Sequence, residues 1–417
     1  MLLDRYFVII EISLTWHNNN GTLQKGCGQM AILDKIQLQK ATTFQLGVSK
    51  ISEDQVQIAV WKPQVSRCQL CLYQHGQKQK IRMTSMEESG IHDVFAVVLY
   101  GEQISKRMDG LEYDFIADGS HIIDPYTKAV SGREHFGKPK QHIRGKFDFS
   151  EFDWSGENRR NLAEHEMVLY QCHVRGFTRH ASSGVAAPGT FAGLQEKIPY
   201  LKELGVNTIL PLPLYDFDEC MKNKEGLPTD RVNYWGYIGD AFYFAPKSGY
   251  SSGRTSASEE LKQLVKNLHQ NGMNLILDMY FVDRTPEFIL ECLRYYVLEF
   301  HIDGFRINQD SMDTSWLRLD PVLSHTKILG GSWGRQPENR ARPVCYEMND
   351  KFLVDARRFL KSDEGQAAHM YKRFREQGDG VGLIHYITQN NGFTLRDLIS
   401  YDVKHNEANG ERGKDGT

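Results

Sequence analysis

The residues best placed to do chemistry lie at the ends of two strand-like runs. Asp278 falls near the end of the apolar run 273–280. In the run 301–310, apolar residues alternate with Arg306 and Asn308, which is typical of a short buried strand. An amide such as that of Asn308 is a poor nucleophile and carries no charge to stabilise a cationic transition state. The sequence therefore raises the question of whether the chain is an enzyme or keeps only the scaffold of one.

Helices and strands alternate around these two runs. The segment before residue 301 has apolar residues at spacings of four, three and four: Ile289, Leu293, Tyr296 and Phe300. A second helical pattern ends at Gly272, directly before the run that contains Asp278. Strand patterns fill seven positions, at about 168–173, 206–211, 273–280, 301–308, 326–330, 343–347 and 384–390. This alternation predicts an α/β fold with a parallel (β/α)8-type TIM barrel, whose functional side chains lie at the carboxyl ends of the strands.

Several motifs resemble one family. The run Val168–Thr178 is the most specific match, and it is similar to the first barrel strand of isoamylases and bacterial glycogen debranching enzymes, in glycoside hydrolase family 13 of the α-amylase superfamily. The motifs Asn233–Tyr237, Asp303–Arg306 and Gly392–Leu395 match the same group. The resemblance covers roughly residues 41–417 and implies an enzyme of glycogen or α-glucan metabolism that hydrolyses α-1,6 bonds.

The resemblance also assigns the catalytic positions, and none of them holds a catalytic group. Asn308 stands where the family has its nucleophile, Gly331 where it has the acid/base Glu, and Asn391 where it has a third Asp. Retaining glycosidases need two carboxyl groups about 5 Å apart. Other acids nearby are Asp283, Asp310 and Glu347. They could replace the missing groups only if the nucleophile, the acid/base and the third Asp had all been relocated. We therefore expect a pseudoenzyme without intact catalytic residues.

Four residues of the family's substrate site are present: Trp235, Tyr237, Asp278 and Arg306. In the family the Tyr at position 237 stacks on the sugar beside the scissile bond. An alternative without sugar binding stays open, in which Tyr237 is a stacked aromatic and Arg306 is a buried arginine paired with Asp278 or Asp303. The family's long cleft-walling loop between these two Asp positions is reduced to a few residues around 284–286.

Residues 41–150 have short alternating strands separated by turn residues, which predicts an all-β, immunoglobulin-like sandwich. This segment resembles the family 48 carbohydrate-binding module. Trp61 could stack on a sugar, but at a strand end of this module a core position is the more common one. The predicted division is an N-terminal extension (1–40), the sandwich (41–150), a linker (151–165) and the barrel (166–417).

Composition excludes other classes of function. A net charge of −3 gives no reason to expect a nucleic-acid or membrane partner, and no run approaches the roughly 20 apolar residues that span a bilayer. The Cys-x-x-Cys of Cys68 and Cys71 lies in a strand pattern without a second pair, so two strand thiols are expected rather than a metal or redox site. We expect no cofactor and no metal. Reduced thiols and no leader pattern in Met1–Trp16 indicate the cytoplasm.

No apolar run follows Leu398-Ile399, so the barrel is expected to be incomplete, truncated before its last strand. An open barrel exposes strand edges, which natural proteins avoid. A missing segment, a partner subunit or the run Tyr6–Ile10 could cover the gap. Three functions stay open: an α-glucan-binding or regulatory protein, such as a scaffold for an active debranching subunit or for self-association; an active debranching enzyme with relocated residues; or a degenerate product.

Overall fold

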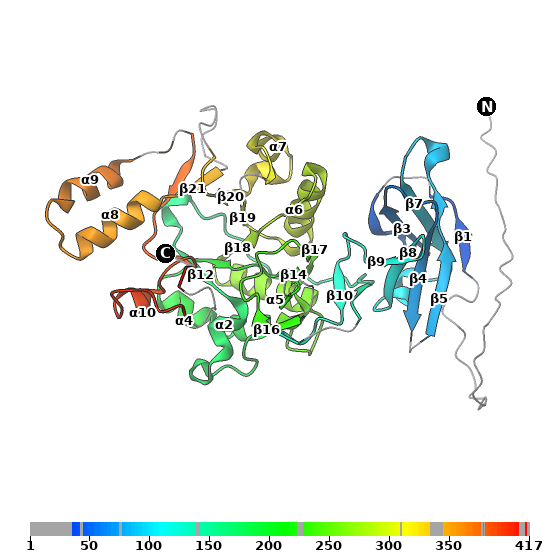
Figure 1. The fold of residues 1–417 in the computed structure, drawn as a ribbon, viewed down its shortest axis with the longest axis horizontal. Coiled ribbons are helices and arrows are strands. Elements are labelled where there is room, and N and C mark those ends of the chain that lie inside the picture. The colour runs from blue at the N-terminus through cyan, green and yellow to red at the C-terminus, as the bar shows by residue number, and fades with distance from the viewer. Residues whose placement is uncertain are drawn as a thin grey trace. The chain divides into compact units, whose positions relative to one another are not determined.

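The computed structural model describes residues 36–41, 45–74, 77–138, 142–222, 228–308, 311–333, 345–376, 378, 380–407 and 413–414. It consists of two compact units (Figure 1). The first contains the residues up to Asp153 together with Phe242–Ser248, and the second contains Trp154–Ala241 and the residues from Gly249 on. Asp310 and the run Tyr6–Ile10 lie outside the described residues. None of the helices described is long and apolar enough to cross a membrane.

The first unit is built from two antiparallel sheets. One has the strand order β1-β7-β3-β2, with β6 beside β7; its strands are β1 (Gln37–Gln39), β2 (Gly47–Ser52), β3 (Gln55–Trp61), β6 (Thr84–Ser85) and β7 (Val94–Tyr100). The other has the order β10-β11-β8-β4-β5, with β9 beside β8; its strands are β4 (Cys68–Gln74), β5 (Gln77–Arg82), β8 (Glu112–Ala117), β9 (Ser120–Ile122), β10 (Ala129–Ser131) and β11 (Arg144–Lys146). The short helices are η1 (Glu87–Ser89) and α1 (Ile104–Met108). The predicted β-sandwich is confirmed, and β1 extends it into the segment that was predicted to be an extension.

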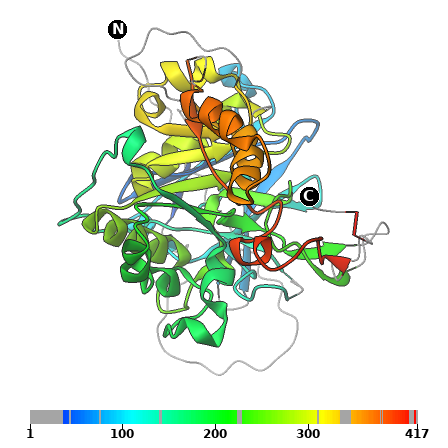
Figure 2. The ribbon, with the colours of Figure 1, turned by 90° about the vertical axis from the view of Figure 1, so that its left-hand side faces the viewer.

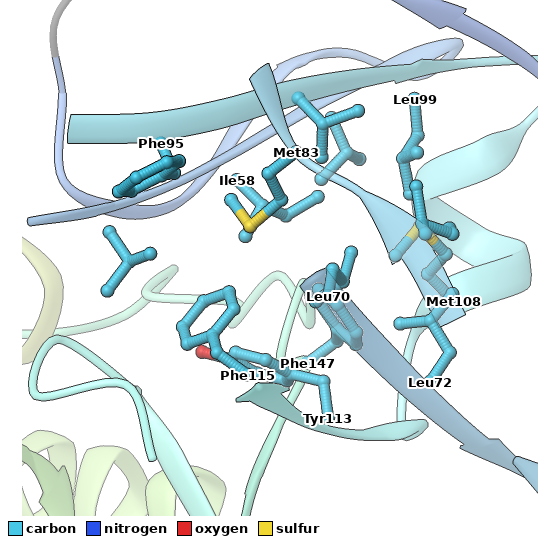
Figure 3. Close-up of a cluster of buried hydrophobic side chains, with 14 of the residues drawn as sticks. Ile58, Leu70, Leu72, Met83, Phe95, Leu99, Met108, Tyr113, Phe115 and Phe147 are labelled. Atoms are coloured by element: carbon cyan, nitrogen blue, oxygen red, sulfur yellow. The ribbon is translucent and has the colours of Figure 1, made fainter. Parts of the chain in front are cut away.

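Alternate residues of both sheets form the core of the sandwich. Ile58, Phe95 and Leu99 come from one sheet, and Leu70 and Phe115 from the other. Figure 3 shows these side chains pointing into the same space. Such alternation is what a strand with one buried face requires.

Two sequence interpretations in the sandwich have different outcomes. Cys68 and Cys71 are free, buried thiols of β4, as predicted. The expectation that Trp61 belongs to the core is wrong, because its side chain is 54% exposed. Val56, Ile58 and Val60 point into the core, so the period of two turns Trp61 to the opposite face of β3.

The second unit is organised by a parallel sheet in sequential order, β12-β13-β18-β19-β20-β21-β22. Its strands are β12 (Leu169–Cys172), β13 (Thr208–Pro211), β18 (Asn274–Met279), β19 (Gly304–Ile307), β20 (Lys327–Gly330), β21 (Cys345–Met348) and β22 (Gly382–Ile384). The sheet is curled like part of a TIM barrel, and Figure 2 shows it behind α8 and α9 (orange). The predicted α/β barrel, incomplete within the described residues, is confirmed.

Helices connect these strands. The longer ones are α5 (Ala257–Gln270), α6 (Pro286–Phe300), α8 (Asp350–Leu360) and α9 (Gln366–Arg375). The shorter ones are α2 (Val174–Arg179), α3 (Phe191–Gln195), α4 (Ile198–Glu203), α7 (Thr314–Leu319) and α10 (Leu395–Leu398), with the 3-10 turns η2 (Glu164–Glu166), η3 (Ala181–Ser183), η4 (Ser248–Tyr250) and η6 (Leu323–His325). The remaining strands are β14 (Tyr215–Phe217), β15 (Cys220–Lys222), β16 (Pro228–Val232) and β17 (Ala241–Pro246), and all of β17 after Ala241 belongs to the first unit.

Local sequence explains the helix α6 that leads into β19. The Thr285 side chain accepts a hydrogen bond from the backbone N–H of Phe288, and Pro286 occupies the first turn, where its missing N–H costs nothing. All four residues of the predicted apolar stripe on α6 are buried. His301 ends the helix in the left-handed conformation, with φ of 54°.

The seventh strand is shorter than the sequence suggested. The predicted strand at 384–390 was placed too late, because β22 ends at Ile384 and a turn near Gln389 and Gly392 follows the loop after it. Leu210, Ile276, Leu329 and Tyr346 fill the interior between the barrel strands. Side chains from different strands thus form the packed core expected of such a barrel.

Candidate functional site

Three of the predicted site residues form one hydrogen-bonded group at the carboxyl ends of the barrel strands. Asp278 of β18 and Arg306 of β19 are register partners on adjacent parallel strands. Arg306 Nη1 donates to Asp278 Oδ2 at 2.9 Å, and the Tyr237 hydroxyl donates to the same oxygen at 2.7 Å. Arg306 Nη1 also lies 3.3 Å from the Tyr237 hydroxyl. The arginine therefore pairs with Asp278, one of the two acids considered for it.

Burial dominates the electrostatics of this group. Asp278 is only 4% exposed, and this burial raises the pKa of its carboxyl, which Arg306 and Tyr237 offset in part. Burial also raises the pKa of Tyr237, so the phenol keeps its proton and acts as a donor. The pKa of Arg306, which burial by itself would lower, is raised by the charge of Asp278. The group can hold a hydroxyl-bearing ligand, but Asp278 and Arg306 already satisfy one another.

Two exposed aromatic side chains flank Tyr237. Trp235 is 41% exposed, and its ring centroid lies 6.4 Å from that of Tyr237. Tyr280, directly after β18, is 37% exposed and lies 5.5 Å from Tyr237, edge to face. The sequence interpretation missed Tyr280, although an aromatic residue directly after the strand of Asp278 was a usable signal. Together the three rings offer apolar faces beside the polar group.

The Asn308 side chain is fastened to the backbone of a neighbouring loop. Its Nδ2 donates to the Phe281 carbonyl oxygen at 2.8 Å, and its Oδ1 accepts from the Phe281 N–H at 2.9 Å. An amide has both a donor and an acceptor, whereas an ionised carboxylate has only acceptors. Asn308, at the predicted nucleophile position, thus joins β19 to the loop 280–285, and that loop is short, as the sequence predicted.

The predicted acid/base position, Gly331, carries no carboxylate. Gly331 is exposed, one residue beyond the end of β20. The nearby Glu347, which pairs in register with Gly330, accepts a hydrogen bond from the backbone N–H of Trp333 at 2.5 Å. The Trp333 indole N–H donates to the Tyr346 carbonyl at 3.1 Å. Glu347 therefore holds the backbone after β20 in place.

The predicted position of the third Asp, Asn391, also holds an amide. Asn391 is exposed, and its Oδ1 accepts from Nδ2 of Asn390 at 3.4 Å. Asn390 connects this loop to the polar group, because its Nδ2 lies 3.5 Å from the Tyr237 hydroxyl. The Asn390 Oδ1 atom is buried and accepts no hydrogen bond from the described residues. Asn390 is thus a further polar residue beside Tyr237.

The structure brings Trp235, Tyr237, Asp278 and Arg306 together, with Asn390 and Tyr280 beside them. Asp283, one of the acids considered as a substitute, is exposed on the loop after β18. Within the described residues, no cluster of His, Cys, Asp and Glu could hold a metal ion.

Family models match both units. Residues 45–127 match carbohydrate-binding module 48 (isoamylase N-terminal domain), and residues 171–287 match the α-amylase catalytic domain. Isoamylase 3, chloroplastic, of Oryza sativa subsp. japonica is 32% identical over 95% of this chain and 64% of its own length. The glycogen operon protein GlgX homolog of Haemophilus influenzae is 27% identical over 89% of this chain and 69% of its own length.

A solved structure has the same fold. The pullulanase SAP of group B Streptococcus superposes with a TM-score of 0.64 at 19% identity, over 87% of this chain and 59% of that one. The chain spans roughly half to two thirds of the length of the curated relatives it matches. The chain thus combines a carbohydrate-binding module 48 segment with an α-amylase-type segment, and the curated proteins it is similar to are isoamylases and glycogen debranching enzymes.

Proposed function

We propose that this chain binds α-glucan without hydrolysing it, and that it serves glycogen or starch metabolism as a binding or regulatory protein. The observation that carries the proposal is the state of the nucleophile position. Asn308 has no negative charge, and both polar atoms of its side chain are occupied by the Phe281 backbone. Catalytic groups that act as a unit lose most of the rate when one of them is removed, and here Gly331 and Asn391 are changed as well.

Two kinds of surface support glucan binding. Trp61 of the sandwich presents an exposed indole at the end of β3, and sugars bind through stacking on aromatic faces together with hydrogen bonds. In the barrel, Trp235 and Tyr280 flank the polar group around Tyr237. Because Arg306 and Asp278 satisfy one another, we propose that the sandwich contributes most of the affinity. One neighbour in fold, the type I pullulanase of Bacillus subtilis, is described as complexed with maltose.

Calorimetric titration of the full chain with maltoheptaose tests this assignment. We expect a Kd of about 0.1–1 mM, which corresponds to −4 to −5.5 kcal/mol. Trp61→Ala should weaken binding about tenfold, the factor that 1.4 kcal/mol produces. Tyr100→Ala is the matched control, because Tyr100 is an exposed aromatic at the opposite end of the strand beside β3, and it should bind as the wild type does. If Tyr237→Ala abolishes binding and Trp61→Ala does not change it, the site is in the barrel.

The second candidate function is debranching by relocated residues. The observation in its favour is Glu347, a carboxylate at the carboxyl end of β21, beside the missing acid/base position. Its hydrogen bond from the Trp333 N–H favours a structural role. Hydrolysis that is lost in Glu347→Gln would support this second candidate.

Location and assembly complete the proposal. Cytoplasmic location stays a prediction, and some relatives are named as chloroplastic. Assembly with an active debranching subunit, or self-association, also stays a prediction. Light scattering coupled to size-exclusion chromatography tests it: a complex is expected, and a monodisperse monomer with a sharp melting transition would contradict it.

A further inference from the structure

A second cluster of charged side chains lies at the amino-terminal ends of the barrel strands, opposite the end that holds Asp278. His269, in the last turn of α5, is fully buried. Its Nδ1 lies 2.5 Å from Oε1 of Glu157, and its Nε2 lies 2.9 Å from Oδ2 of Asp303. Only the imidazolium form carries a hydrogen on both ring nitrogens. A neutral ring would point a lone pair at one of the two carboxylates.

Further donors hold both carboxylates in position. Asp303 Oδ2 also accepts the backbone N–H of Leu275 at 2.8 Å, and Asp303 Oδ1 accepts from Arg159 Nε at 3.0 Å. The other oxygen of Glu157 lies 2.7 Å from Nδ1 of His301. The two negative charges thus face His269 directly, while Arg159 and His301 lie one contact further away. On α5 itself, the nearest basic residue before His269 is Lys266, one turn earlier.

The cluster fastens the segment 154–161, which leads to the first barrel strand and is here called the connector. The ring of Trp154 stacks on His301 with centroids 3.9 Å apart. Arg159 Nη2 donates to the Ile302 carbonyl at 2.9 Å, and Gln270 Nε2 donates to the Gly156 carbonyl at 3.0 Å. These contacts surround the His269 site, so the connector depends on the charge at its centre.

We infer that His269 is an imidazolium that latches the connector to the amino-terminal end of the barrel, and that loss of its proton releases the connector. Burial would lower the pKa of His269, but the hydrogen bonds and charges of Asp303 and Glu157 outweigh burial and raise it. For a base whose folded-state pKa is raised, the stabilisation is complete below the unfolded value of about 6.5 and is lost as pH rises through the folded value. Because both ring nitrogens face carboxylates, we expect the latch to be closed at neutral pH and to open as pH rises through the raised pKa of His269.

Nitrogen NMR of the labelled full chain tests the protonation state directly. We expect both ring nitrogens of His269 to carry hydrogen at pH 7, with assignment by comparison with His269→Gln. If one nitrogen is unprotonated at pH 7, the ring is a neutral tautomer and the proposal is wrong. The protonation state is read in the wild-type chain, and the variant serves only to assign the signals.

Limited trypsin digestion tests the latch, because Arg159 and Arg160 are cleavage sites within the connector. We expect His269→Gln to increase the rate of cleavage there at pH 7.5 at least tenfold, since both donors of the glutamine amide lie on one nitrogen and the amide has no positive charge to balance the two carboxylates. His325→Gln is the matched control at an exposed histidine and should digest as the wild type does. Raising the pH from 7 to 9.5 should speed connector cleavage of the wild type, relative to cleavage elsewhere, but not that of His269→Gln. Equal connector cleavage in wild type and His269→Gln would overturn the proposal.

Discussion

Replacing Asn308 by aspartate should destabilise the barrel, although aspartate is the nucleophile that the family resemblance predicts at this position. In the wild type the amide donates to the Phe281 carbonyl at 2.8 Å and accepts from the Phe281 N–H at 2.9 Å. An aspartate keeps the acceptor and loses the donor, so a carboxylate oxygen faces a carbonyl oxygen. Phe281 is only 3% exposed. The Phe281 carbonyl that would lose the amide donor is therefore shielded from water.

The size of the effect follows from the lost hydrogen bond. A buried polar group left without its partner costs about 1–3 kcal/mol, and the added charge places the expected loss near 3 kcal/mol at pH 7.5. At 1.36 kcal/mol for each pKa unit, this loss corresponds to a carboxyl pKa near 6 in the folded state, against about 3.9 when unfolded. Because the protonated acid can donate to Phe281, the variant keeps its stability below about pH 4. It loses stability as pH rises from 4 to 6.

Urea denaturation of the full chain at pH 4.5 and 7.5 measures this difference. We expect Asn308→Asp to lose about 3 kcal/mol at pH 7.5 and about 1 kcal/mol at pH 4.5. Asn391→Asp is the matched control, because it is the same chemical change at an exposed asparagine and should stay within about 0.5 kcal/mol of the wild type. If Asn308→Asp is as stable as this control at pH 7.5, the two hydrogen bonds of the Asn308 amide to Phe281 do not stabilise the barrel as the structure indicates.

Three further outcomes are expected. Arg306→Met should cost about 3 kcal/mol at pH 7.5, because it leaves the buried Asp278 carboxylate without its positively charged partner. Urea denaturation should show a smaller cost at pH 4.5, because burial raises the pKa of Asp278, Arg306 no longer offsets that rise, and protonation removes the unpaired charge. An equal cost at both pH values would contradict this. The triple change Asn308→Asp, Gly331→Glu and Asn391→Asp should leave pullulan hydrolysis near background, because misplacement by about 1 Å costs ~100-fold; strong debranching would show that only the acids had been lost. A thiol reagent at pH 8 should label Cys220 far faster than Cys71 and Cys345, because burial raises the pKa of both to about 11; equal labelling of all three in the native chain would refute this.

Period and alternation were sufficient to predict the elements that carry the site. The apolar stripe on α6 and the apolar patterns of β18 and β19 can be recognised from residues that are close together in the sequence. The pairing of Asp278 with Arg306 was one of two predicted alternatives, because adjacent parallel strands bring their ends together.

Features that depend on loop geometry could not be predicted in this way. The two hydrogen bonds of Asn308 require the backbone path of the loop after β18, which no periodicity specifies. The exposure of Trp61 could not be predicted, because Ala59 and Val60 lie on opposite faces of β3 and are both apolar. The sequence therefore does not distinguish the two faces. The latch consists of Glu157, His269 and Asp303, which lie in three separate stretches of the chain. Only the fold brings their charges together.

The central claim, that the chain binds glucan but does not cleave it, is tested most directly by hydrolysis of pullulan and glycogen by the purified full chain. Release of reducing ends is measured beside Glu347→Gln, Asp310→Ala and an active debranching enzyme as a positive control. We expect no release above that of a heat-inactivated sample, and no difference among the wild type and the two variants. Turnover that persists through purification and disappears in Glu347→Gln or Asp310→Ala would contradict the claim and identify the relocated acid.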